Sequence, residues 1–191
     1  MVMTSKRRTK TTHYTEHSIT PRGLSSVHWR STGLQLFSQL VESYQGETMR
    51  RLRSRTAWAL QGNFTAWSTG TVLNDTPIAF GGMDLTVLEF FENLGRLVRT
   101  KALDPQITWN YFADAVQAYW RAAQPTIQAE RDRVDEKDLF EDFEWLSQEF
   151  AVRDANGHRL ATPRTPSHHR CLEFLASEER LSLGRSSSAI G

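Results

Sequence analysis

The chain has 191 residues, of which 39% are hydrophobic and 24% are charged, a composition typical of one soluble globular domain. This composition excludes a collagen-like or disulfide-rich protein, and the formal net charge of +1 indicates no overall preference for a polyanion. The single cysteine, Cys171, excludes an intramolecular disulfide, so we expect a cytoplasmic protein. The least polar stretch, residues 76–91, is interrupted by proline, glycine and acidic residues, so we expect no membrane span.

The charges are unevenly distributed along the chain. Residues 1–30 contain six basic residues and one acidic residue without hydrophobic periodicity, which predicts a disordered basic N-terminal arm. Residues 84–150 contain seven basic and 14 acidic residues, together with 11 of the 20 aromatic residues. Because aromatic side chains bury the largest areas, we expect the core to lie in this second segment.

Two helices are predicted after the arm. The first has its apolar face at Leu34, Phe37, Leu40, Val41 and Tyr44 and ends at Gly46. The second begins at Glu47, which is expected to pair with Arg51. Its apolar face consists of Met49, Leu52, Thr56, Ala59 and Leu60. Residues 62–82 are predicted to form a loop with one helical turn at most, because glycine and proline interrupt any period.

The strongest helical signals follow this loop. Asp84 is the predicted N-cap of a helix with an apolar stripe at Val87, Phe91, Leu94 and Val98. Gly95 inside that helix indicates that a neighbouring element passes closely. Asp104 and Pro105 start the next helix, which Pro125 is expected to kink or end. Its apolar face consists of Thr108, Phe112, Ala115, Val116, Tyr119, Trp120 and Ala123.

Two further helices complete the predicted fold, which is all-α, a small helical bundle of about five to six helices with a disordered basic N-terminal arm. One runs from Lys137, with Leu139, Phe140, Phe143, Leu146 and Phe150 on its apolar face. The other covers roughly residues 167–183, with Cys171, Leu172 and Leu175 on one side. The predicted organisation is a basic arm at 1–30, a helical domain at 31–152, a linker at 153–167, and a C-terminal helix with a frayed tail at 168–191.

Part of this pattern resembles a known family. The run from Val87 to Arg99, with a phenylalanine-glutamate pair before Leu94-Gly95, is followed by Trp109, by Tyr119-Trp120 at the end of the next helix, and by residues 143–146. Over roughly residues 47–150 the chain is similar to an uncharacterised bacterial all-helical family, the domain of unknown function numbered four-seven-six-zero. The resemblance implies an all-helical bacterial protein and assigns no functional residue.

Two groups of side chains have the spacing of metal ligands. One is an acidic helix face with Asp138, Glu141, Asp142 and Glu149. The other is a C-terminal cluster with His168, His169, Cys171 and Glu173. A di-metal bundle needs histidines, but none lies between residues 28 and 158, and the second cysteine of a zinc motif is missing. A solvated helix face and a packed thiol explain the two groups better, so we expect no metal, no cofactor and no catalytic residue.

The pattern as a whole favours a non-enzymatic helical interaction protein that binds a protein partner or a second copy of itself. The expected contact residues, at the edges of their apolar stripes, are Trp109, Tyr111 and Trp145. The alternative is nucleic-acid binding through the arm and through phosphate contacts of Arg50, Arg51, Arg53 and Arg55. An enzyme with an unrecognised site is the third hypothesis.

Overall fold

The protein is built from helices. The computed structural model describes residues 24–68, 80, 83–156 and 167–182, except for the side chains of residues 24–31, 67 and 182. These residues form α1 (Leu24–Gln45), α2 (Glu47–Ser68), α3 (Thr86–Arg99), α4 (Pro105–Val134), α5 (Glu141–Ala155), α6 (His168–Glu179) and a 3-10 turn, η1 (Arg180–Ser182). No strand occurs among the described residues, and the predicted all-α bundle of about five to six helices is confirmed.

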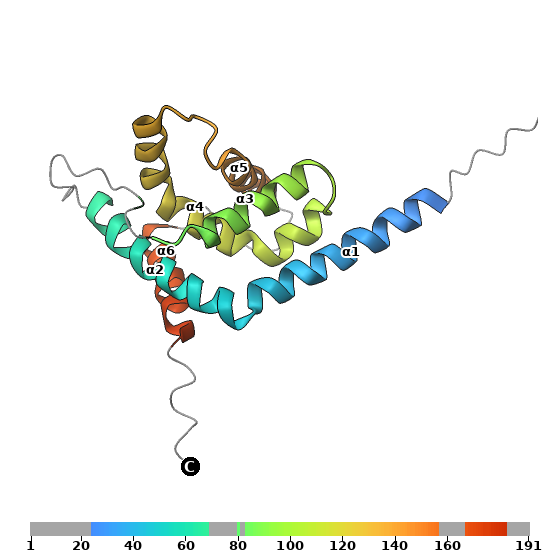
Figure 1. The fold of residues 1–191 in the computed structure, drawn as a ribbon, viewed down its shortest axis with the longest axis horizontal. Helices are drawn as coiled ribbons and strands as arrows, with labels where there is room; N and C mark the ends of the chain where they lie inside the picture. Colours follow the sequence, from blue (N-terminus) through green and yellow to red (C-terminus); the bar gives the residue numbers. More distant parts are fainter. Residues whose placement is uncertain (1–23, 69–79, 81–82, 157–166, 183–191) are drawn as a thin grey trace, which may run out of the picture.

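Several predicted segments lie outside the described residues. These are the arm up to residue 23, residues 69–79 and 81–82 of the loop, residues 157–166 of the linker, and the tail from residue 183. Helix α1 begins at Leu24, inside the range predicted as the arm. Residues 24–32 contain neither proline nor glycine, so a helix that packs further along extends through them at little cost. Figure 1 shows α1 leading away from the other helices.

Helix α2 is longer than predicted. It continues through Gly62 to Ser68, whereas the loop was expected to begin at Gly62. Phe64 is buried on the face that also buries Ala57 and Leu60. Burying a phenylalanine contributes about 1.5–3 kcal/mol, which exceeds the cost of about 1 kcal/mol for a glycine in a helix. Tertiary packing therefore stabilises α2 beyond Gly62, where the sequence pattern predicts its end.

Helix α4 begins as predicted and ends later. The Asp104 carboxylate accepts the backbone N–H groups of Gln106 and Ile107, at 2.8 and 3.0 Å, and Pro105 occupies the first helical position. Pro125 does not end the helix, which runs to Val134. Thr126 and Ile127, directly after the proline, are buried, and this packing offsets the loss of one helical hydrogen bond.

Helix α5 begins at Glu141 and not at Lys137 as predicted. The residue before it, Phe140, has φ 59°, a left-handed conformation that a continuous right-handed helix does not allow. Asp138 therefore lies ahead of the helix and does not share a helical face with Asp142. The metal-binding hypothesis for the acidic face required that shared face.

The core is aromatic, and most of it comes from α3, α4 and α5. The ring of Phe91 stacks on Phe143 with centroids 5.1 Å apart and lies 5.4 Å from Tyr119. Phe112 meets Tyr44 of α1 edge to face at 5.2 Å. Such ring pairs add about 0.5–1.5 kcal/mol each to the gain from burial. The core thus lies where the aromatic residues are concentrated, and α1 contributes to its edge.

Gly95 is the point where α3 and α5 come closest. A Cβ atom at Gly95 would lie 2.6 Å from the carbonyl carbon of Asp142 and still closer to its oxygen. Real Cβ atoms essentially never approach other atoms so closely. The prediction that a neighbouring element passes close to Gly95 is confirmed, and that element is the first turn of α5.

Helix α6 packs on α2 and α4. Its N-cap, Ser167, accepts the backbone N–H of Arg170 at 3.3 Å. Cys171 and Leu175 are fully buried, and the Cys171 thiol donates to the carbonyl oxygen of Ala118 in α4 at 3.3 Å. The predicted C-terminal helix is therefore part of the folded body.

Candidate functional site

Four polar side chains meet inside the protein where α6 packs on α2 and α4. Arg53 Nε lies 2.9 Å from Glu178 Oε2, and both side chains are about nine-tenths buried. The Tyr119 hydroxyl donates to the same carboxylate oxygen at 3.0 Å. The Arg53 guanidinium lies 4.0 Å from the centre of the Tyr44 ring and donates to the Tyr44 carbonyl oxygen at 3.3 Å. A single glutamate thus joins α6 to an arginine of α2 and a tyrosine of α4.

Burial controls the protonation of this cluster. It raises the pKa of Glu178 above the ordinary value of a glutamate, and the nearby charge of Arg53 opposes that shift. Burial also raises the pKa of the Tyr119 and Tyr44 hydroxyls, so both tyrosines are neutral at physiological pH. All four residues are buried. The arrangement therefore holds α6 in place and presents almost no reactive surface to a substrate.

The raised pKa of Glu178 predicts how stability depends on pH. Folded Glu178 binds its proton more tightly than unfolded Glu178, whose pKa is about 4.3. Its contribution is therefore most favourable below that value and is lost as the pH rises through the folded-state pKa. We expect the unfolding free energy of the wild type minus that of Glu178→Gln to fall over this window, as measured by urea unfolding. A difference that rises with pH would show that Arg53, and not burial, controls the carboxyl group.

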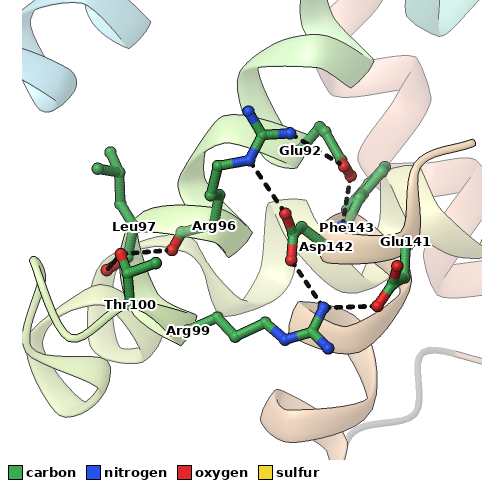
Figure 2. A network of polar contacts seen from close by, with 8 residues as sticks. All are labelled: Glu92, Arg96, Leu97, Arg99, Thr100, Glu141, Asp142 and Phe143. Carbon is green, nitrogen blue, oxygen red and sulfur yellow. Dashed lines mark hydrogen bonds and ion pairs between the residues drawn. The ribbon is translucent and has the colours of Figure 1, made fainter. Parts of the chain in front are cut away.

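A second polar network joins the end of α3 to the start of α5 (Figure 2). Arg99 Nη1 lies 2.6 Å from Glu141 Oε1 and 3.0 Å from Asp142 Oδ1, and Arg96 Nε lies 3.2 Å from Asp142 Oδ2. Glu92 accepts the backbone N–H of Phe143 at 2.8 Å. Phe140 makes no side-chain cap, so a carboxylate of α3 satisfies a first-turn donor of α5. Two carboxylates of the predicted acidic face thus bind guanidinium groups.

The four arginines predicted to contact phosphate occupy different environments. Arg53 is buried in the ion pair with Glu178, so its assignment as a phosphate contact is wrong. Arg51 is exposed and forms the predicted pair with Glu47 at 2.5 Å. Arg55 is exposed and Arg50 is half-buried. The structure therefore does not bring the four guanidinium groups onto one surface.

The three predicted contact aromatics also separate. Trp109 has no exposed surface and donates its indole N–H to Asp154 Oδ1 at 3.0 Å, so its assignment as a contact residue is corrected to core. Tyr111 is 43% exposed, and its hydroxyl accepts a hydrogen bond from Gln45. Trp145 is half-buried, with the Arg99 guanidinium 5.9 Å from its ring centre. Of the three, Tyr111 is the most accessible.

The C-terminal cluster is held by contacts within the protein. His168 stacks on Phe64 with ring centroids 4.6 Å apart, and His169 lies 3.2 Å from Glu173. Burial raises the pKa of Cys171 to about 11, so at neutral pH it is a thiol and not a nucleophilic thiolate. Among the described residues, no three histidine, cysteine, aspartate or glutamate side chains are grouped as metal ligands.

Trp58, a surface residue that the sequence interpretation missed, is the most exposed large apolar side chain of the described residues at 68%. It stands on an outward row of α2 at alternating spacings of four and three residues. The row consists of Arg51, Arg55, Trp58, Gly62 and Thr65, all exposed. A signal was present in the sequence, because Trp58 lies two positions from both Thr56 and Leu60 and therefore points away from the predicted apolar face. We call these five residues the α2 row.

Comparison with known proteins finds a match to one family in the middle of the chain. No curated protein and no solved structure matches the sequence. None of the described helices combines the length and the hydrophobicity that a membrane span requires. The family match begins at Leu85, just before α3, so it does not include the stretch 47–84 of the predicted resemblance. Residues 85–150 match the family described as Domain of unknown function (DUF4760), which confirms the resemblance for α3, α4 and most of α5.

Proposed function

We propose that the protein is a non-enzymatic helical interaction protein that binds a protein partner through the α2 row. The observation that carries this proposal is the exposure of Trp58 beside Arg55, three residues before it. Tryptophan, tyrosine and arginine are the residue types enriched among the residues that contribute most to binding at the centres of protein interfaces. Helix α2 lies at the edge of the molecule (Figure 1), where a partner can approach.

Nucleic-acid binding is the competing function for the same surface. An aromatic ring beside basic side chains also suits base stacking and phosphate contact. Of the four arginines, however, Arg53 is buried with Glu178, and Arg51 is paired with Glu47. On this helix, the remaining positive charge favours a protein surface over a phosphate backbone, which needs several free basic contacts. The basic arm, residues 1–30, is the other part of the nucleic-acid alternative.

Photochemical crosslinking tests the proposal. A photoreactive phenylalanine in place of Trp58 is expected to give a nuclease-resistant adduct with another protein in bacterial cells that produce the full chain. The same probe at Val152, an exposed position of α5, is the matched control. The captured protein is then purified, and its Kd is expected to rise at least tenfold with Trp58→Ala and to stay unchanged with Val152→Ala. Equal capture at both positions, or an adduct that nuclease removes, contradicts the proposal.

A further inference from the structure

Among the glycines that the structure describes, Gly62 has no neighbouring atom that requires a glycine. At Gly95 and Gly33 a Cβ atom would meet a backbone oxygen of a neighbouring segment, from Asp142 and Ala102 respectively. At Gly62, inside α2, a Cβ atom would meet nothing within 4 Å. Glycine is less favourable than alanine in a helix interior, so the fold is less stable than it would be with alanine at position 62. A substitution that would stabilise the fold at such a position can be costly for function.

Gly62 lies next to Trp58 on the α2 row, one helical turn further along. Row members are four and three residues apart in alternation, so they lie on one face of α2, along which a second helix can pack. The exposed Trp58 ring can insert between side chains of a second helix, and the adjacent Gly62 leaves room for a side chain of that helix. A residue without a side chain allows another backbone to approach closely. Both features fit a helix that packs along α2.

The charge of the row indicates the composition of that helix. Arg51 and Arg55 occupy its N-terminal half, and Glu47 is the acidic residue paired there. Hydrogen bonds from Thr86 lower the pKa of the Asp84 carboxyl group, and the charge of exposed Arg55 adds a smaller lowering, so Arg55 has one carboxylate in its vicinity. Glu47 and Asp84 do not fully offset the basic residues at this end, since half-buried Arg50 adds a further positive charge. Carboxylates on a partner would complement this end of the row.

We infer that the α2 row is the docking seam for an acidic amphipathic helix of another protein. Its apolar side chains pack around Trp58, its backbone approaches Gly62, and its carboxylates lie beside Arg55. The row spans about 21 Å, so the docked helix needs about four turns. This inference rests on the proposed function, since it specifies the partner of the same surface.

Peptide selection tests the partner class. The full chain is used to select from a displayed library of 21-residue helical peptides, and the selected peptides are synthesised with a fluorescent label for anisotropy measurements. We expect helical sequences with glutamate or aspartate at one end, and at least tenfold weaker binding when those residues are changed to lysine. Trp58→Ala and Arg55→Glu are each expected to weaken binding at least tenfold, with Val152→Ala as the unchanged control.

Gly62→Ala is the decisive variant. Alanine favours the helix, so Tm is expected to rise by about 2–4 °C, as measured by circular dichroism. The added methyl group fills the room that Gly62 leaves, so peptide affinity is expected to fall at least tenfold. Because the variant is more stable, its loss of binding cannot result from misfolding. Unchanged affinity overturns the helix-docking inference.

The possible failures are distinguishable. If Trp58-dependent peptides are selected but are neutral or non-helical, the acidic-helix inference is wrong and the proposed function stands. If the chain sediments as a dimer that Gly62→Ala dissociates, the partner is a second copy, which also overturns the inference. If neither crosslinking nor selection depends on Trp58, the proposed function fails as well.

Discussion

Replacing Gly95 by alanine is expected to lower the free energy of unfolding by about 3 kcal/mol or more. The added Cβ would meet the backbone of Asp142, which cannot rotate away as a side chain could. Helices α3 and α5 would have to separate, which weakens the stacking of Phe91 on Phe143 and stretches the bonds from Arg96 and Arg99. Urea unfolding followed by circular dichroism measures the loss. In a chain of this size, it corresponds to a fall in Tm of about 6–12 °C.

Gly62→Ala provides the matched control for this prediction. Both glycines lie inside helices, so the effect of the substitution on helix propensity is the same, about 1 kcal/mol in favour of alanine. Only Gly95 has a neighbouring backbone within contact distance. Opposite signs for the two substitutions are therefore expected. A neutral Gly95→Ala variant would show that α3 and α5 are less closely packed than described.

Replacing Glu178 by alanine is expected to destabilise the fold by about 3–5 kcal/mol at pH 7. The substitution leaves the Arg53 charge buried without its carboxylate and removes an acceptor of the Tyr119 hydroxyl. Exposed ion pairs contribute far less to stability, about 0–1 kcal/mol, so a large loss of unfolding free energy indicates that the Arg53–Glu178 pair is buried. Arg99→Ala, in a more exposed pair with Glu141, is the comparison variant. Chemical unfolding of both variants measures the difference, and equal small losses would contradict the buried pair.

The double substitution Arg53→Met and Glu178→Leu separates charge burial from packing. With both charges removed, no uncompensated charge remains, and the variant is expected to regain at least half of the stability lost in Glu178→Ala. The Tyr119 hydroxyl keeps an acceptor in the backbone carbonyl of residue 53, at 3.3 Å. A double variant no more stable than the single one would show that the cluster's hydrogen bonds, and not the charge balance, hold α6.

The sequence predicted those parts of the fold that depend on local rules. The Asp104 cap and the Glu47–Arg51 pair were predictable because their partners lie within four residues. The Asp84 carboxylate accepts the backbone N–H of Thr86 at 2.9 Å, although Leu85 holds the N-cap position. Gly95 was predictable because a glycine inside a strong helical pattern indicates close packing. The neighbour itself, α5, required the structure.

The parts that were missed depend on partners far away in the sequence. Arg53 was assigned to a phosphate surface because its ion-pair partner, Glu178, lies 125 positions later, where spacing gives no information. Trp109 is predicted at the surface because the acceptor of its indole N–H, Asp154, lies on another helix 45 positions later. Trp58 was predictable in principle, because its exposure follows from the helical position alone. Gly62 and Thr65 can be placed on the same row as Trp58 only once α2 is known to continue past Gly62.

The hydrogen bonds of Tyr119 extend beyond the segment that matches the family. Tyr119 lies inside the matched residues 85–150, but both groups that accept its hydroxyl, Glu178 and the carbonyl of residue 53, lie outside them, one on each side. A fragment limited to that segment would lack both acceptors and would uncover the face of α4 that α2 and α6 cover, so that the Tyr119 ring and hydroxyl would face water. The segment that matches the family therefore does not contain all of the residues that cover its core. A protein restricted to this segment would need another element, or a second chain, to cover that apolar face of α4.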